Sequence, residues 1–328
     1  MGKTPAEASL FFQRLQQNLR YHQSLLRDEV RNRLFAAALE RTVQPGSRVL
    51  DIGSGSGVWA IYAAKLGAAR VTAVETEPML LPLIRALARE NGVLDKITIV
   101  NGFSTQISLP HKFDVIVSEM IGNQTFDEGL VTILTDARDR FLAKDGIMIP
   151  QTGSLVAAPA YVPAENATPQ GVDISAEYLR KLALNVDYKL GDRPNVRLLA
   201  PAADILSVDL RTAHAEPSYV GLAAKWNLAE LSRANAIVLW ARSTLFDDIE
   251  LDTWETEHWL PAVLPFESFS QGGGELSFTV NLSPSQFYWN VTVDGETPRS
   301  YTPIFASAKI ESDMQFNPRR RQIRRAMR

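Results

Sequence analysis

Between residues 47 and 150, short apolar runs alternate with segments whose apolar residues recur at helical spacing. The runs predict strands, and the segments between them predict helices. The expected strands are Arg48–Ile52, Val71–Glu75, Ile97–Val100, Phe113–Ser118 and Gly146–Ile149, and the expected helices are Val58–Leu66, Pro78–Glu90 and Phe126–Leu142. Because strands that alternate with helices form a parallel sheet covered on both faces, this region predicts a Rossmann-like α/β domain.

The pattern changes on both sides of this region. Residues 6–41 show helical periodicity, which predicts a helical segment ahead of the sheet. After Pro150 the apolar and polar positions alternate in short segments, and turn signals at residues 272–274 and 294–295 separate the later ones. This half predicts an antiparallel β unit, which a helical pattern at residues 173–185 interrupts as a protruding arm.

Composition describes an ordinary globular protein. The chain has 328 residues, of which 45% are hydrophobic and 22% charged, so two packed units are expected. It has no cysteine, which excludes disulfides, thiolate metal sites and a cysteine nucleophile, and no two of its four histidines have metal-ligand spacing. We expect no metal. Without a signal pattern or a membrane-spanning apolar run, we expect a cytoplasmic protein with no membrane partner.

The charge is distributed unevenly along the chain. The formal net charge is −3, although the last ten residues contain six arginines, so the rest of the molecule is acidic. An acidic body argues against nucleic acid as a partner and is compatible with a cationic substrate.

A glycine-rich turn follows the first expected strand. The segment Val49–Gly57 leads from that strand through Gly53 and Gly55 into a helix, and glycines at such a turn permit tight bends and close approach of a ligand. Glu75 ends the next expected strand, where a carboxylate can accept hydrogen bonds from two ribose hydroxyls. The turn therefore predicts a nucleoside-containing cofactor.

Two details of this turn distinguish between cofactors. Val58 occupies the position at which a dinucleotide fingerprint has its third glycine, and the carboxylate of Asp51 disfavours a pyrophosphate. A positively charged nucleoside fits better, so we expect S-adenosyl-L-methionine. The alternative is a glycine turn that binds another ligand or none.

Glu119 and Glu128 lie nine positions apart, at the end of an expected strand and across a short polar loop. Two carboxylates at a strand end can hold one planar cation, and guanidinium fits because its donors form a rigid fork. Since its pKa lies above about 12, guanidinium is a poor nucleophile. An enzyme must orient it, localise its charge and accept a proton. We expect the two glutamates to do the first two tasks; a solvated pair of loop glutamates is the alternative.

Several separate motifs resemble those of the protein arginine N-methyltransferases, and the resemblance extends from about Phe11 to Met314. The matching segments are Leu25–Arg31, Val49–Gly57, Glu75, Ser118–Glu128 and Glu257–Trp259, the last with glutamate in place of the threonine of a Thr-His-Trp loop. The resemblance implies a class I methyltransferase, with a Rossmann-like domain followed by a β-barrel domain that carries a dimerisation arm. It also implies a homodimer, in which the arm reaches the nucleotide domain of the partner.

The resemblance also implies roles for individual residues. Arg31 is expected to bind the cofactor carboxylate. His258 is expected to pair with Asp28, join the two domains beside the substrate and take up a proton near neutral pH. The full set comprises the catalytic residues Asp28, Glu119, Glu128 and His258; the cofactor residues His22, Arg31, Asp51, Gly53, Gly55, Glu75 and Thr105; and the substrate residues Glu119, Glu128 and Trp259. Trp259 also has a simpler interpretation, as packing at the domain junction.

The chain departs from the family pattern around the substrate. The family's tyrosine-rich N-terminal stretch is reduced to Phe11-Phe12 with Gln16, Thr105 or Ser104 replaces an adenine-binding glutamate, and Met120, Asn123 and Gln124 stand where aromatic residues are usual. These departures leave two acceptors open, an arginine-containing protein and free L-arginine. Methylation of another small guanidino or amine metabolite is an alternative activity. A weakly active dimeric scaffold is an alternative of another class, which the presence of all four expected catalytic residues disfavours.

The expected organisation has four parts. Residues 1–45 form a helical segment over the cofactor, and residues 46–150 form the Rossmann-like domain. Residues 151–315 form the β-barrel domain, with the arm at about 165–205. Residues 316–328 form a basic tail.

Overall fold

The computed structural model describes residues 5–123, 125–126, 128–163, 174–191, 195–214, 216–283, 286–297 and 299–302. The basic tail, Asp127 and the parts of the arm at 164–173 and 192–194 lie outside these residues. Within the described ranges, no helix combines the length and the apolar character needed to cross a membrane.

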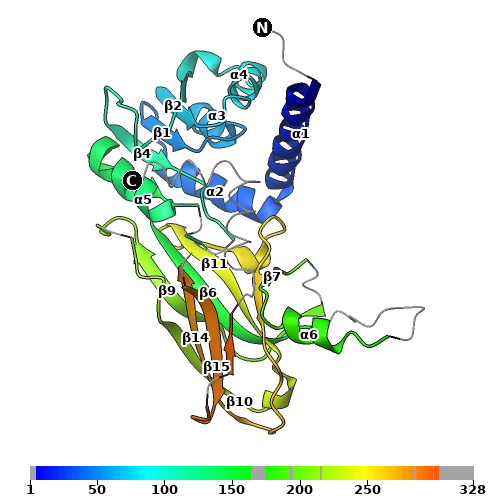
Figure 1. Cartoon of the computed structure of the whole chain (residues 1–328). Coiled ribbons are helices and arrows are strands. Elements are labelled where there is room, and N and C mark those ends of the chain that lie inside the picture. The colour runs from blue at the N-terminus through cyan, green and yellow to red at the C-terminus, as the bar shows by residue number, and fades with distance from the viewer. Residues whose placement is uncertain are drawn as a thin grey trace.

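The N-terminal segment consists of two helices, α1 (Pro5–Arg27) and α2 (Glu29–Thr42). Asp28 separates them in an extended conformation, and its carboxylate accepts a hydrogen bond from the backbone N–H of Arg31. An aspartate in this geometry is a favourable N-cap, so the chain begins a new helix instead of continuing the first. Figure 1 shows α1 standing beside the α/β unit. The periodicity predicted the helical segment but not its division.

The α/β unit confirms the predicted Rossmann-like arrangement. Its five parallel strands have the order β3-β2-β1-β4-β5. Helices α3 and α4 pack on the β1–β3 side, and α5 packs on β4 and β5. The elements are β1 (Arg48–Ile52), α3 (Val58–Lys65), β2 (Arg70–Glu75), α4 (Leu81–Glu90), the 3-10 turn η1 (Leu94–Lys96), β3 (Ile97–Asn101), β4 (Phe113–Val117), α5 (Leu130–Phe141) and β5 (Leu142–Ile149).

Parallel strands have their carboxyl ends at one edge of a sheet, where α/β proteins bind ligands. The segments that follow β1, β2 and β4 therefore meet at the same edge. They contain the glycine turn, Glu75 and Glu119. The topology thus brings together three groups that the sequence predicted separately.

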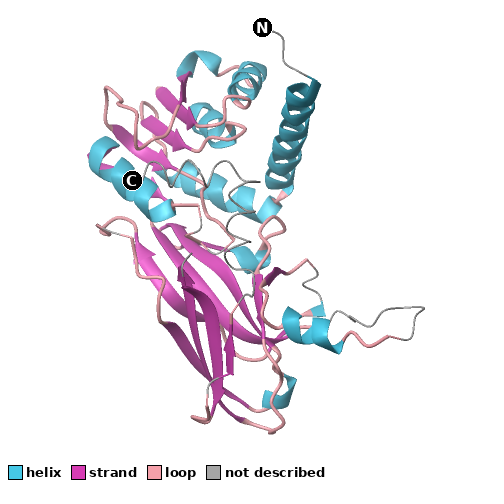
Figure 2. Ribbon diagram, in the orientation of Figure 1, coloured by secondary structure: helices cyan, strands magenta, loops and turns pink. Residues whose placement is uncertain are grey.

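A cis peptide bond joins Ile149 to Pro150, and antiparallel sheets follow it (Figure 2). One sheet has the order β10-β14-β15-β16; the other has the order β7-β13-β11-β6-β8, with β12 beside β11 and β9 beside β6. The strands are β6 (Thr152–Tyr161), β7 (Tyr188–Lys189), β8 (Arg197–Leu198), β9 (Ala203–Asp209), β10 (Leu222–Leu228), β11 (Ala236–Phe246), β12 (Ile249–Asp252), β13 (Ala262–Pro265), β14 (Gly274–Ser283), β15 (Gln286–Val293) and β16 (Arg299–Tyr301), with 3-10 turns η3 (Leu231–Arg233) and η4 (Thr253–Glu255). This architecture is the predicted barrel-like second domain.

Strands β6 and β11 are buried on both faces. Leu155 and Leu239 lie in the large core that continues into the α/β unit, whereas Val156 and Trp240 lie in a second, smaller core. Successive side chains of a strand point to opposite faces, so a strand between two cores must be apolar at every position. This explains why the chain reads as an unbroken apolar run at residues 155–160.

The arm projects from the barrel and carries helix α6 (Glu177–Ala183) (Figure 1). Ile174, Tyr178 and Leu179 on this segment are exposed in the single chain. The prediction of a helical arm is confirmed for the part of the segment that the structure describes.

Candidate active site

The glycine turn between β1 and α3 requires its glycines. Gly53, Gly55 and Gly57 have φ angles of +70°, +57° and +82°, a region that disfavours other residues. A Cβ on Gly55 would lie 2.6 Å from Cε1 of His22, and one on Gly57 would lie 2.8 Å from Cγ2 of Ile84. The turn is therefore closely packed, and α1 approaches it through His22.

Glu75 is fixed beside this turn by backbone donors. Its Oε2 accepts a 2.7 Å hydrogen bond from the N–H of Gly55, and its Oε1 accepts a 2.8 Å bond from the N–H of Glu77. A carboxylate has about four acceptor positions, so both oxygens retain capacity for two ribose hydroxyls. Its position fits the predicted role.

Asp51 is a buried acid at the end of β1. Burial raises its pKa from 3.8 to about 7, an effect that Ser54 and the N–H of Ala60 partly offset. Oδ2 accepts from the N–H of Ala60 at 3.1 Å, whereas Oδ1 has no hydrogen-bond partner among the described residues. A carboxylate with one unpaired oxygen beside a glycine turn suits a cationic ligand and opposes a pyrophosphate.

These residues fit S-adenosyl-L-methionine better than a dinucleotide. Glu75 would hold the ribose, and Asp51 would supply negative charge for the sulfonium; both roles stay predictions. Thr105 and Ser104 lie in the turn after β3; Ser104 is buried and Thr105 is half-buried. His22 is buried against Gly55. Cofactor contacts of Thr105 and His22 stay predictions.

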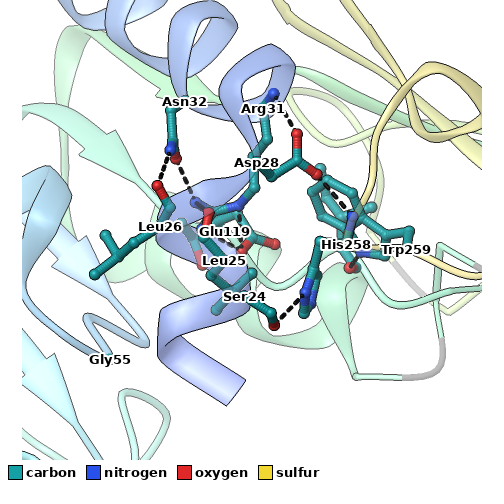
Figure 3. Close-up of polar contacts among 12 residues, drawn as sticks. Ser24, Leu25, Leu26, Asp28, Arg31, Asn32, Gly55, Glu119, His258 and Trp259 are labelled. Atoms are coloured by element: carbon teal, nitrogen blue, oxygen red, sulfur yellow. Dashed lines mark hydrogen bonds and ion pairs between the residues drawn. The ribbon is translucent and has the colours of Figure 1, made fainter. Parts of the chain in front are cut away.

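The guanidinium of Arg31 forms a buried ion pair with Glu119 at the base of α2. Nη2 and Nε of Arg31 donate to Oε2 of Glu119 at 2.6 and 3.1 Å, and the two side chains are only 3% and 8% exposed (Figure 3). Burial raises the pKa of Glu119, and Arg31 counteracts that rise. The family resemblance assigned Arg31 to the cofactor, and the sequence assigned Glu119 to the substrate; neither gave a sign that the two side chains pair.

Two aromatic rings also lie against the guanidinium of Arg31. The Cζ atom of Arg31 lies 5.3 Å from the Trp59 ring centroid and 5.9 Å from that of Phe35, and the two rings stack at 5.0 Å. Cations bind favourably over aromatic faces. Sequence reasoning missed Trp59. Its position in the first turn of α3, directly after the glycine turn, was the available signal.

Glu128 differs from Glu119 in its surroundings. It precedes Gly129, the N-cap of α5, and its side chain is exposed, whereas Glu119 is buried. The two-sided grip on a guanidinium by both residues stays a prediction.

The predicted side-chain pair of His258 and Asp28 is wrong. Asp28 accepts hydrogen bonds from the backbone N–H groups of Glu257 and His258, at 3.0 and 2.9 Å, and the Nδ1 of His258 lies 3.0 Å from Oγ of Ser24 instead (Figure 3). Asp28 caps α2 with one oxygen and holds the 257–258 loop with the other. The aspartate joins the two domains as expected, but through the backbone.

The expectation that His258 takes up a proton near neutral pH is also wrong. Burial lowers its pKa from 6.5 to about 4, and the charge of Arg31 lowers it further, against the opposing effect of Asp28. The imidazole is therefore neutral at pH 7. Sequence reasoning missed Ser24, which lies at helical spacing from Asp28 on the α1–α2 segment.

Trp259 lies in the junction between the two domains. Its indole is buried, and Nε1 donates a 2.6 Å hydrogen bond to the carbonyl of Ile121. Next to it, the N–H of Leu260 donates to Oδ1 of Asn123 at 2.8 Å. This supports the packing interpretation of Trp259, and a substrate contact stays a prediction. Both bonds tie the loop after β4 to the barrel.

The fold and site together define a methyltransferase with a Rossmann-like cofactor domain followed by a barrel-like domain. Comparisons with known proteins agree. The family of ribosomal protein L11 methyltransferases matches residues 33–153. The arginine N(omega)-methyltransferase of Streptomyces achromogenes subsp. streptozoticus is 31% identical over 274 residues, 80% of this chain and 75% of that protein. The chain belongs to the arginine N-methyltransferase family.

Other relatives and solved structures extend the comparison. A probable histone-arginine methyltransferase 1.4 of Arabidopsis thaliana is 28% identical over 87% of this chain, which spans 60% of that protein's length. Protein arginine methyltransferase 10 of Arabidopsis thaliana has a similar fold, with a TM-score of 0.72, 23% identity and coverage of 87% of this chain and 98% of that one. The Trypanosoma brucei PRMT1 enzyme-prozyme heterotetrameric complex with AdoHcy gives a TM-score of 0.70 at 22% identity, covering 85% and 96%.

Proposed function

We propose that this protein transfers a methyl group from S-adenosyl-L-methionine to a guanidino nitrogen of arginine. The observation that carries the proposal is the Arg31–Glu119 pair. Glu119 already binds one guanidinium through two of its N–H groups in a buried site at the sheet edge. An arginine acceptor has to be recognised in the same way, through charge-assisted hydrogen bonds from the N–H groups of its guanidinium to a carboxylate.

The charges in the site are suited to this chemistry. When bound, S-adenosyl-L-methionine supplies an electrophilic methyl group on a sulfonium. Glu119 and Glu128 hold the acceptor guanidinium and draw its positive charge away from the attacked nitrogen. As the new N–C bond forms, that nitrogen becomes more acidic and must lose a proton. His258 does not hold this proton at pH 7, because its pKa is lowered to about 4; its neutral imidazole can only relay the proton to solvent.

Positioning is the main contribution of the protein, since methyl transfer needs an in-line approach and exclusion of water. Asp28 contributes by holding α2 and the 257–258 loop together. Arg31 lies between Glu119 and the Asp28 cap, where it can also bind the cofactor carboxylate. The names of the relatives support arginine as the acceptor. One relative is named as an arginine methyltransferase and another as a histone-arginine methyltransferase.

Radiolabelled cofactor incubated with free L-arginine and with an arginine-rich peptide tests the proposal. Glu128→Gln serves as the site variant, because Glu128 is exposed and its loss should leave the fold intact. We expect about a 100-fold fall in kcat/KM, in the range of losing one transition-state contact. Glu90→Gln, an exposed glutamate on α4, is the control. Unchanged transfer by Glu128→Gln, or no transfer to any guanidino compound, would refute the proposal.

We further propose a homodimer formed through the arm. The exposed apolar residues Ile174, Tyr178 and Leu179 on a projecting segment support it, because an exposed cluster of large apolar side chains favours an interface. The Trypanosoma brucei PRMT1 enzyme-prozyme complex is heterotetrameric, so assembly occurs among proteins of this fold.

A further inference from the structure

A cavity of about 410 Å³ opens between α1 and the 257–258 loop, outside the buried pair of Arg31 and Glu119. Its lining residues are Arg20, Gln23, Ser24, Arg27, Glu257 and His258. Residues 20, 23, 24 and 27 recur at helical spacing, so one face of α1 forms one wall. His22 and Leu25 point the other way and are buried.

The cavity is next to the proposed acceptor site. Ser24 and His258, which both line it, lie 3.0 Å apart from Oγ to Nδ1. Nη1 of Arg31 lies 3.4 Å from the carbonyl oxygen of Leu25, the residue after Ser24, and the same guanidinium binds Glu119. Figure 3 shows this sequence of contacts around the α1–α2 junction. A ligand whose guanidinium binds Glu119 can therefore extend its other end into this cavity.

The charges of the cavity are not used within the described part of the chain. The guanidinium groups of Arg20 and Arg27 make no hydrogen bond or ion pair with any described residue, and neither does the side-chain carboxylate of Glu257. His258 is neutral at pH 7. Two guanidinium groups and one carboxylate therefore face a solvent-filled space, with a net positive charge.

This arrangement complements one chemical group in particular. An α-amino acid end carries a carboxylate and an ammonium separated by a single carbon. Guanidinium is the preferred partner for a carboxylate because it offers parallel donors. A peptide-linked arginine has neither charge at this position, since both groups are in amide bonds.

We propose that this cavity binds the α-carboxylate of free L-arginine through Arg20 and Arg27, with Glu257 facing the α-ammonium. The inference rests on the proposed arginine methylation and specifies its acceptor. Free L-arginine is then the preferred methyl acceptor, and an arginine within a protein is methylated less efficiently.

Comparison of acceptors that share a guanidinium tests it first. Agmatine has the guanidinium and the chain of L-arginine without the carboxylate, and L-arginine amide has the carboxylate neutralised. We expect kcat/KM for L-arginine to exceed both by about 10-fold, close to the 1.4 kcal/mol of a strong charged contact. Equal values for the three compounds, or a higher value for an arginine-rich peptide, would overturn the inference.

The double variant Arg20→Gln/Arg27→Gln then localises the effect. We expect the preference for L-arginine over agmatine to fall towards 1 while kcat/KM for agmatine stays unchanged. Arg14→Gln, an exposed arginine nearer the start of α1, should keep the wild-type preference. A merely structural role for the two arginines would lower both rates equally, and that result would contradict the carboxylate site.

Failure of the proposed function gives a different pattern. If no guanidino compound is methylated, the function is refuted, and calorimetry of L-arginine and agmatine binding still measures the carboxylate preference. Tighter binding of L-arginine that disappears in Arg20→Gln/Arg27→Gln supports the site. Equal binding of the two compounds opposes it.

Discussion

The carboxylate of Asp28 accepts a 2.9 Å hydrogen bond from the backbone N–H of His258, and the imidazole of the same residue contacts Ser24. The aspartate therefore acts as a clamp between the N-terminal helices and the barrel. Its second oxygen caps α2. One buried side chain thus fixes both the helix that carries Arg31 and the loop that carries His258.

Replacement of Asp28 should loosen this junction. Asparagine has one acceptor oxygen, so Asp28→Asn cannot satisfy the cap and the two loop N–H groups together. We expect the free energy of unfolding to fall by about 1–3 kcal/mol, the cost of buried donors left without partners. Urea denaturation measures it. Glu29→Gln, the exposed neighbour, is the control, and equal stability of the two variants would contradict the clamp.

His258 should titrate well below the usual range of histidine. Burial lowers its pKa to about 4, so the native state disfavours protonation relative to the unfolded chain. Its contribution to stability is full above pH 6.5, the unfolded value, and is lost as pH falls towards about 4. NMR titration of the ring, assigned with His258→Gln, checks this. A midpoint near 6.5 would restore the His–Asp proton pair that the sequence suggested.

Asp51 should produce the opposite pH dependence. Its pKa is raised from 3.8 to about 7, so the folded protein binds this proton more tightly than the unfolded chain. The stability it contributes is present below pH 3.8 and is lost as pH rises through about 7. We expect Asp51→Asn to gain stability relative to wild type between pH 5 and 8, measured by urea denaturation at each pH. If the stability difference between Asp51→Asn and the wild type did not change with pH, the carboxyl group of Asp51 would not be buried.

The same acid should discriminate between sulfonium and thioether. Above pH 7 an ionised Asp51 attracts the charged S-adenosylmethionine and not the neutral S-adenosylhomocysteine. Calorimetry measures both affinities. The affinity for S-adenosylmethionine divided by that for S-adenosylhomocysteine should rise from pH 6 to pH 8 in the wild type and stay constant in Asp51→Asn. Parallel pH dependence of the two proteins would exclude Asp51 from this role.

Trp59 should position Arg31. Trp59→Leu removes the ring face next to the guanidinium and leaves a cavity, and we expect about 1–3 kcal/mol of lost stability. Since Arg31 then turns more freely, KM for the cofactor should rise about fivefold, from a contact worth about 1 kcal/mol. Trp59→Phe keeps a ring and should retain most of the affinity. If Trp59→Phe and Trp59→Leu raise KM for the cofactor equally, the aromatic ring does not position Arg31.

The arm should govern assembly. The double variant Tyr178→Ser/Leu179→Ser removes two exposed apolar side chains, and Tyr178 is 75% exposed in the single chain. Because the residues contact no core, we expect a folded monomer where the wild type is a dimer. Light scattering with size-exclusion chromatography measures the mass. A wild-type monomer, or a dimeric variant, would contradict the proposed interface.

Much of the fold could be predicted because its signals are local. The period of apolar residues located β1 to β5 and the helices between them within a few positions, and glycines marked the turn after β1. The break at Asp28 was less visible, because periodicity continues through it. It depends on a cap whose second oxygen bonds residues 229 and 230 positions away.

The sequence alone determined the class of the protein. Strand-end placement of Asp51, Glu75 and Glu119, with the glycine turn, follows from the order of elements in a parallel sheet. Tertiary structure decided how the charges are paired. Arg31 meets Glu119 across 88 positions, and the direction of the His258 ring depends on Ser24 in another domain. These contacts and the pKa shifts come from packing and loss of water around the side chains, which no local pattern of residues records.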